Sequence, residues 1–320
     1  RAAAPPAAPA QAASASEDPM DKLRRRLGEA MGGGSLQADS PGELRLTTRT
    51  SSPAAAGAAQ TATAARHTTA PGGTLPDKPR PTRSHDTRAA STAHVHWSYE
   101  GPGGPDAWGR LRPEFAKCSS GQRQSPIDLR DGIQVQLEPI RFDYQPASRF
   151  GVIDNGHTVQ VNVAPGNFIE TMGRRFHLRQ FHFHRPSEER IDGRQSDMAA
   201  HLVHQDAEGR LAIVAVLLER GGAQPVVQAV WNNLPLEKGE EQAAQVGIDL
   251  NQLLPAERGY FTYMGSLTTP PCSEGVLWMV MKQPVPISAD QLSIFARLYP
   301  MNARPVQPAA GRMVKESATP

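Results

Sequence analysis

Residues 175–184, RFHLRQFHFH, alternate apolar and polar side chains over ten positions. This period of two is typical of a β-strand, whereas a helix has a period of 3.6. Residues two apart on a strand point to the same face, so His182 and His184 project together, with Gln180 just before them. The phenylalanines between them anchor the opposite face. Two imidazoles side by side on a rigid strand form half of a metal site.

The other half follows in residues 198–204, MAAHLVH. If this stretch is a strand, Ala199, His201 and Val203 share one face. A chain reversal near residues 191–194 would pair the two strands antiparallel and bring His201 to the first two histidines. Three neutral imidazoles without a fourth protein ligand leave a coordination position for water, as a catalytic zinc site requires.

The composition limits the other classes of function. A chain of 320 residues can form one large domain or two smaller ones. Its net charge of +2 is too small to indicate nucleic acid or an anionic membrane as a partner. No stretch approaches ~18 consecutive apolar residues, so we expect no membrane span. Because the first residue is Arg1 and not Met, we expect the numbering to begin after a removed or omitted segment.

Two cysteines, Cys118 and Cys272, are either two inert buried thiols or one disulfide. The reducing cytosol disfavours a bond and export favours it. In the chain-entropy model, a bond across so long a loop contributes on the order of 4–5 kcal/mol to stability.

Residues 1–93 form a tail that contains no Phe, Trp or Tyr, and all the aromatic residues lie from Trp97 onward. This Ala-, Pro-, Ser- and Thr-rich composition cannot bury enough apolar surface to offset chain entropy, so it predicts disorder. Residues 19–31 can form a short helix that Asp18 caps and residues 32–34, GGG, end. At about three turns it is marginal alone. It is therefore either a transient helix or one used for docking or self-association.

From residue 94 onward, short alternating segments separated by Gly, Pro and Asn predict a mixed α/β domain that is predominantly β. Residues 211–218, LAIVAVLL, predict a buried strand. A helix is expected after Ser288, which can cap it together with Gln291, and it should end before Pro300. We assign residues 94–320 to this domain.

The order of several motifs resembles that of the alpha-class carbonic anhydrases. The resemblance covers roughly residues 94–308 and none of the tail. It depends on QFHFH at 180–184, HLVH at 201–204, SLTTPP at 266–271, HWSY at 96–99, GQRQSPID at 121–128, DNGH at 154–157 and NARP at 302–305. Any one motif is weak, but so many in the right order are not expected by chance.

This resemblance implies a central twisted, mostly antiparallel sheet with short peripheral helices, following the disordered tail. It also implies a zinc enzyme that interconverts carbon dioxide and bicarbonate, with His182, His184 and His201 as ligands. In carbonic anhydrases generally, zinc lowers the pKa of bound water to about 7, which supplies a hydroxide nucleophile at neutral pH.

Further roles follow from the same resemblance. Thr268 would accept the proton of the zinc hydroxide and donate its own to Glu188, while Thr269 would border bicarbonate. His157 matches the proton shuttle, since a histidine with a pKa near 6.5 suits proton transfer at neutral pH. Relay waters would be ordered by Tyr99, Asn155 and Gln160. The apolar wall for carbon dioxide would consist of Val203, Ile213, Leu267, Val276 and Trp278, each of which can also be plain core.

The chain departs from the family pattern beside the metal. Gln180 and the backbone carbonyl of Asn302 match the acceptors for His182 and His184. For His201 the family has a glutamate two residues earlier, where this chain has Ala199, and a histidine where this chain has Glu189. Our hypothesis is that Glu189 accepts from His201. Arg185 also replaces the usual residue after the second ligand.

The two cysteines are placed as in bacterial, exported family members, in which this pair forms a disulfide. The resemblance therefore implies a periplasmic or secreted enzyme. A homodimer is one possibility, and the tail could tether the enzyme to an envelope partner. The competing function is a binding or surface protein on a carbonic anhydrase fold that has lost its activity, and Ala199 is the feature that favours it.

Overall fold

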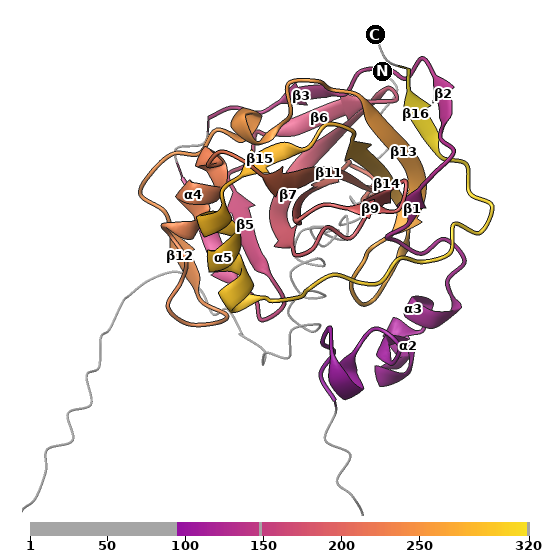
Figure 1. Cartoon of the computed structure of the whole chain (residues 1–320), viewed down its shortest axis with the longest axis horizontal. Coiled ribbons are helices and arrows are strands. Elements are labelled where there is room, and N and C mark those ends of the chain that lie inside the picture. Colours follow the sequence, from indigo (N-terminus) through magenta and orange to yellow (C-terminus); the bar gives the residue numbers. More distant parts are fainter. Residues whose placement is uncertain (1–94, 147–148, 319–320) are drawn as a thin grey trace, which may run out of the picture. The chain divides into compact units, whose positions relative to one another are not determined.

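The computed structural model describes residues 95–146 and 149–318 (Figure 1). The predicted tail and its helix over 19–31 lie outside this part of the chain. No helix within the described residues is long and apolar enough to cross a membrane.

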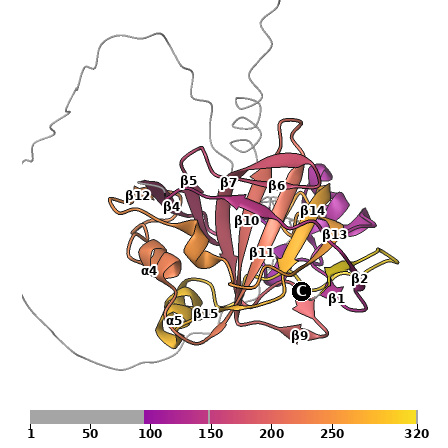
Figure 2. The ribbon, with the colours of Figure 1, turned by 90° about the horizontal axis from the view of Figure 1, so that it is seen from above.

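Thirteen strands of the described residues form one large sheet, which twists strongly from one edge to the other (Figure 2). Most neighbouring strands in this sheet pair antiparallel, and three pairs are parallel. The predicted fold class is therefore confirmed. The main path of the sheet runs through β12 (Glu241–Ala243), β4 (Phe150–Asp154), β5 (Val159–Val163), β7 (Arg174–His184), β10 (Met198–Gln205), β11 (Leu211–Arg220), β14 (Glu274–Met281), β13 (Tyr260–Ser266), β16 (Lys315–Ser317) and β2 (Ile133–Val135).

Three further strands branch from this path, and three more form a small separate sheet. The branches are β3 (Arg141–Asp143), β6 (Phe168–Thr171) and β15 (Val285–Ile287); the small sheet holds β1 (Asp128–Leu129), β8 (Arg190–Ile191) and β9 (Arg194–Gln195).

The helices are short and peripheral (Figure 1). The predicted capping box is present at the start of α5, where Ser288 and Gln291 exchange side-chain and backbone hydrogen bonds. Between residues 95 and 318, leaving aside 147–148, the helices are η1 (Gly101–Gly103), α2 (Trp108–Leu111), η2 (Pro113–Phe115), α3 (Lys117–Ser120), α4 (Pro225–Trp231), η3 (Leu250–Leu253) and α5 (Ala289–Leu298).

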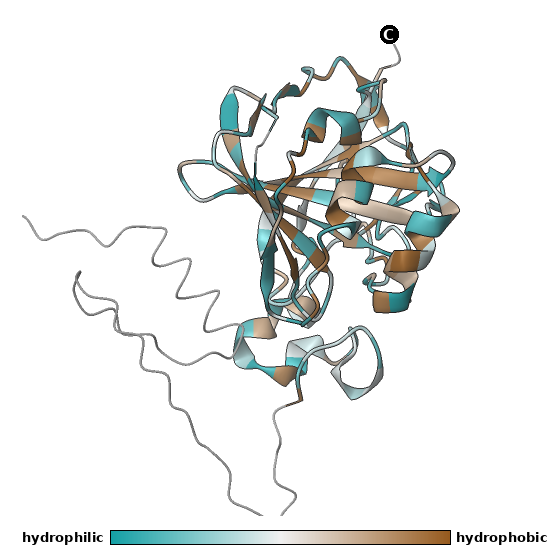
Figure 3. Ribbon diagram, turned by 90° about the vertical axis from the view of Figure 1, so that its left-hand side faces the viewer, coloured by the Kyte–Doolittle hydropathy of each residue, from teal (hydrophilic) through white to brown (hydrophobic). Residues whose placement is uncertain are grey.

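Strand β11 is apolar at nearly every position because both of its faces are covered. Its even-numbered residues 212–218 join the larger core cluster, to which α4 and α5 contribute. Its odd-numbered residues 213–217 join a second cluster on the opposite face. Figure 3 shows the resulting hydrophobic, brown strands inside the domain with more hydrophilic loops around them.

Strand β7 differs from the sequence-based expectation in one detail, because its alternation of apolar and polar residues is interrupted. Val203 of β10 pairs with Gln180, but the next residue of β10, His204, pairs with Leu178. Arg179 is therefore an extra residue in a β-bulge. The bulge lets the apolar side chains on both sides of Arg179 enter the same core cluster. It also turns His182 and His184 to the opposite face.

Candidate metal centre

Two neighbouring strands carry the three predicted ligands. β7 and β10 pair antiparallel, and their register places His201 directly opposite His182. The chain reverses between them through β8 and β9, which pair with each other as a short hairpin. The predicted reversal near residues 191–194 is therefore present.

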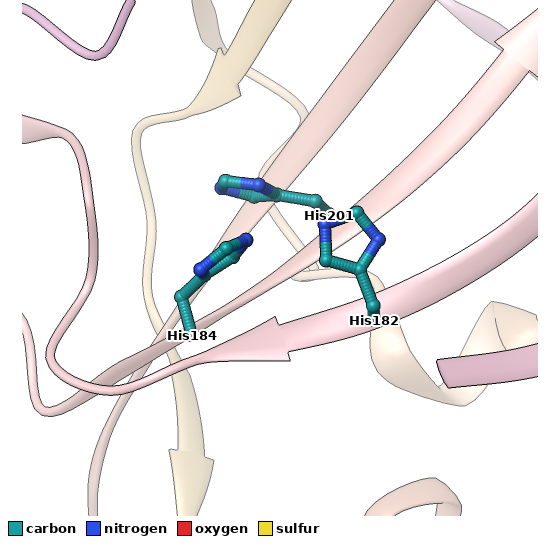
Figure 4. A group of neighbouring side chains, drawn as sticks. All are labelled: His182, His184 and His201. Carbon is teal, nitrogen blue, oxygen red and sulfur yellow. The ribbon is translucent and has the colours of Figure 1, made fainter. Parts of the chain in front are cut away.

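The rings of His182, His184 and His201 converge on one point (Figure 4). One nitrogen from each lies within 4.8 Å of those of the other two. His184 and His201 are almost completely buried. Nε2 of His184 is buried and has no hydrogen-bond partner among the described residues. Three converging imidazoles, one with an unpartnered buried nitrogen, fit zinc as the missing partner.

The outer nitrogen of each imidazole faces an oxygen acceptor. His182 Nδ1 lies 2.9 Å from the side-chain oxygen of Gln180, and His184 Nδ1 lies 2.7 Å from the backbone oxygen of Asn302. His201 Nε2 lies 3.1 Å from Oε2 of Glu189. Acceptors at these positions favour a proton on each outer nitrogen and leave the inner nitrogens free to bind metal. The inner atoms are Nε2 of His182, Nε2 of His184 and Nδ1 of His201.

The structure thus contains the contact that the Glu189 hypothesis requires. Ala199 is fully buried on strand β10, directly opposite His184, and offers only a methyl group there. The carboxylate beside His201 comes from the loop that follows β7. Arg185, at the start of this loop, directs its guanidinium to the backbone oxygen of Pro300 and its backbone N–H to the side chain of Asn302.

Burial and neighbouring charges together determine the protonation of the centre. It lowers the pKa of His182 to about 3, with a further contribution from His201, and lowers the pKa of His184 for the same reasons. Burial also opposes protonation of His201, but Glu189 outweighs it and raises the pKa of this imidazole. The first two imidazoles are neutral at pH 7, as metal ligands must be.

A second carboxylate, Glu188, lies behind the histidines. It is fully buried, and burial raises its pKa to about 7. Oε1 of Glu188 accepts from the backbone N–H of Arg304 at 2.8 Å, and this N–H and the nearby Thr268 side chain both lower the pKa of the carboxyl against the effect of burial. Oε2 lies 3.5 Å from Nε2 of His184. The structure therefore places the Glu188 carboxylate beside the inner nitrogens of His184 and His201, the latter at 3.8 Å.

A cavity of about 120 Å³ opens in front of the histidines. Eight of the residues that the sequence analysis singled out line it, together with Trp97 and Thr158. These eight are Tyr99, Asn155, His157, Gln160, Gln180, His182, His184 and Thr269.

An apolar cluster contacts the centre through Trp278. All five residues of the predicted wall belong to it or pack against it, namely Val203, Ile213, Leu267, Val276 and Trp278. The Trp278 ring meets the His201 ring edge-on, with centroids 5.1 Å apart. The apolar cluster therefore meets the metal centre at His201, and none of the five predicted wall residues lines the polar cavity.

His157 differs from the sequence-based expectation in its protonation. Its ring stacks on that of Trp97, with centroids 3.5 Å apart, and lies 5.1 Å from the ring of His96. Burial lowers its pKa to about 4, and His96 and Lys238 lower it further. The ordinary value near 6.5 was expected because the sequence alone does not reveal this stack.

The predicted disulfide between Cys118 and Cys272 is present, with Cα atoms 5.0 Å apart. The sequence analysis missed Arg304, whose guanidinium donates to the backbone oxygen of Cys118 at 2.8 Å while its own N–H holds Glu188. Its place in the motif at 302–305 was the available signal. Thus one residue connects the disulfide to the metal centre.

Comparisons with known proteins agree with this site. The sequence profile of the eukaryotic-type carbonic anhydrases matches residues 103–318. A carbonic anhydrase of Pectobacterium carotovorum is 41% identical over 71% of this chain and 93% of its own length. One from Nostoc sp. is 43% identical over 72% and 89%. The solved structure of a hyperthermostable carbonic anhydrase from an active hydrothermal vent chimney has a TM-score of 0.68 and 42% identity, covering 70% of this chain and all of that one. The chain therefore belongs to the eukaryotic-type, or alpha, carbonic anhydrase family of enzymes.

Proposed function

We propose that this enzyme binds zinc through His182, His184 and His201 and catalyses the reversible hydration of carbon dioxide to bicarbonate and a proton. Family membership supports the reaction. The observation that carries the zinc proposal is the convergence of three imidazoles, two of them buried, each with its outer nitrogen on an acceptor. When bound there, zinc would lower the pKa of a water molecule to about 7.

Thr268 would orient the attacking oxygen. In our proposal its hydroxyl donates to Glu188, the carboxyl whose pKa it lowers, and a hydroxyl that donates its proton to a carboxylate can only accept on its other side. In our proposal this directs the lone pair of the attacking oxygen toward the carbon. Glu188 is itself held by the backbone N–H of Arg304, so the direction is set by buried and fixed groups.

We propose that the substrate lies against the apolar wall next to His201. Carbon dioxide is apolar and fits the wall formed by Val203, Ile213, Leu267, Val276 and Trp278. Thr269 lines the polar cavity, where it would border the charged product.

The proton would leave through the polar cavity by way of waters ordered by Tyr99, Asn155 and Gln160. Burial raises the pKa of Tyr99, so its hydroxyl stays neutral and can donate as well as accept. His157 would take the proton at the rim of the cavity. Because its pKa is about 4 while stacked on Trp97, we expect the ring to move away from the indole and into water to do so.

Zinc content and stopped-flow carbon dioxide hydration test this function together. We expect wild-type protein to hold one zinc ion per chain and to hydrate carbon dioxide, and an aromatic sulfonamide to inhibit it. The H201A variant should lose both zinc and activity. The matched control is H177A, which removes an exposed histidine from β7 and should keep both. Metal-free wild-type protein after incubation with excess zinc would refute the proposal.

The competing function, a binding protein on an inactive fold, rested on the missing carboxylate at Ala199. The carboxylate of Glu189 lies beside His201, so the absence of a carboxylate at Ala199 no longer favours an inactive binding protein.

The disulfide and the bacterial relatives are consistent with an exported protein, and we propose a periplasmic or secreted location. A homodimer and tethering through residues 1–93 remain predictions. Deletion of residues 1–93, followed by cell fractionation, tests the tether.

A further inference from the structure

Glu189, the acceptor for His201, lies in a loop. The acceptors for His182 and His184 are held more directly by the backbone. Gln180 lies on β7 itself, two residues from the imidazole that it contacts, and the Asn302 acceptor is a backbone carbonyl. The Glu189 side chain must instead be delivered across to β10, where it meets His201. The position of this carboxylate therefore depends on what holds its loop.

Two buried serines hold that loop. The backbone N–H of Ser187 donates to the carbonyl of Ser196 at 3.0 Å, and the N–H of Ser196 donates back to the Ser187 hydroxyl, also at 3.0 Å. The same hydroxyl donates to the backbone carbonyl of Glu189 at 2.9 Å. Gln195 adds a fourth bond, from its side-chain amide to the Ser187 carbonyl at 2.6 Å. We call this set of four hydrogen bonds the serine clasp.

The contact that the serine clasp supports is buried on both sides. Glu189 has no exposed surface and His201 has 1%. A buried carboxylate without a partner is costly, so the imidazole N–H and the carboxylate hold each other in place. If the carboxylate moved away, the proton of the neutral imidazole could shift to Nδ1. That nitrogen would then be unable to bind metal.

We infer that the serine clasp positions Glu189 against His201 and thereby sets how tightly this centre retains its metal. The inference rests on the proposed zinc function. Ser187, Ser196 and Gln195 touch neither metal nor substrate in this scheme, so they are positioning residues. Gln195 of the serine clasp lies in β9. The affinity of the centre for its metal therefore also depends on the hairpin that β8 and β9 form.

Zinc affinity, measured on the full chain by competition with a chromophoric chelator at pH 7, tests this inference. E189A should weaken zinc binding by about 10–100-fold. E189Q, which keeps an acceptor but removes the charge, should have an intermediate effect. S187A should weaken binding by about 2–10-fold, the equivalent of one hydrogen bond. In the E189A background S187A should add nothing further, because the carboxylate it positions is gone.

S288A is the matched control. It also removes a serine hydroxyl that accepts a backbone N–H, in this case at the start of α5, so it should lower stability without changing zinc affinity. Q195A removes the clasp bond from an exposed side chain and serves if S187A does not fold. A second measurement is the ¹H–¹⁵N resonance of the His201 ring in zinc-loaded protein. This resonance should shift in S187A and Q195A but not in S288A.

The inference is overturned if wild-type protein binds zinc and S187A and Q195A bind it equally tightly. It is also overturned if S187A weakens binding by the same factor with and without Glu189. If wild-type protein binds no zinc, the proposed function itself fails.

Discussion

The imidazole of His157 lies flat on the indole of Trp97, with ring planes 10° apart and centroids 3.5 Å apart. The stack covers one face of the imidazole, and burial is the largest cause of its low pKa of about 4. The backbone of the turn is also fixed, since Asn302 donates to the carbonyl of His157 at 3.1 Å. Any movement of this ring therefore has to come from its side-chain torsions.

The first prediction is that the W97A variant raises the pKa of His157 from about 4 toward 6.5, because the ring becomes hydrated. An NMR titration of the His157 Cε1 proton measures this. The H96Q variant should produce a smaller rise, since His96 contributes less than burial. A midpoint near 6.5 already in the wild-type protein would contradict the stacked arrangement in solution.

The second prediction concerns stability in acid. His204 is buried in the core, where its Nε2 lies 2.7 Å from the hydroxyl of Tyr144, and burial lowers its pKa to about 3. Between pH 6.5 and 3 the unfolded chain binds a proton at this residue and the folded chain does not. The stability contributed by His204 is therefore present above pH 6.5 and is lost as the pH falls, by at most about 1.4 kcal/mol per pH unit.

Urea unfolding of zinc-loaded wild-type and H204Q protein at pH 7 and pH 5 measures this loss. Titration of the three ligand histidines is common to both proteins and cancels in the comparison. We expect the wild type to lose about 2 kcal/mol more than H204Q between the two pH values. Equal losses would mean that His204 is protonated, or exposed, in the folded protein.

Part of this fold could be predicted from the sequence, because the spacing of hydrophobic residues indicates which face of a strand is buried. The alternation around His182 and His184 predicted β7, and the unbroken apolar run predicted β11. The bulge at Arg179 was missed. Two adjacent polar residues in a strand fit either an exposed edge or a bulge, and only the pairing with β10 separates the two.

The residues of the site that could be predicted best are those whose side-chain type itself indicates the role, as imidazoles indicate metal binding for the three histidines. The serine clasp was not predicted, because Ser187 and Ser196 are small polar residues in a loop that can hydrogen-bond to many groups. Their partners are determined by the return of the chain through β8 and β9. The low pKa of His157 was missed for a similar reason, since Trp97 lies sixty residues earlier in the chain and meets it only in the folded protein.

The third prediction concerns the disulfide. Cys118 and Cys272 are separated by 154 residues, so the bond removes much of the conformational freedom of the unfolded chain. The double variant C118S/C272S should be less stable than the wild type by about 2–5 kcal/mol in urea unfolding. A reductant should lower the unfolding free energy of the wild type to about that of the variant. It should leave the unfolding free energy of the variant unchanged. Equal stability of both proteins without reductant would contradict a structural role for the bond.

The fourth prediction separates orientation from metal binding at Thr268. Substitution by valine keeps the shape of the side chain but removes the hydroxyl that, in our proposal, donates to Glu188. The attacking oxygen then loses the group that directs its lone pair, so T268V should lower kcat/KM for carbon dioxide on the order of 100-fold. Because Thr268 is not among the converging ligands, zinc content should stay at the wild-type level.

The control for T268V is T262V, which makes the same substitution at a buried threonine of β13 whose hydroxyl has no hydrogen-bond partner among the described residues. It should leave both kcat/KM and zinc content unchanged. If T268V and T262V hydrate carbon dioxide equally fast, Thr268 does not orient the attack. If T268V instead loses zinc, the residue supports the metal centre, and its effect on rate cannot be assigned to orientation.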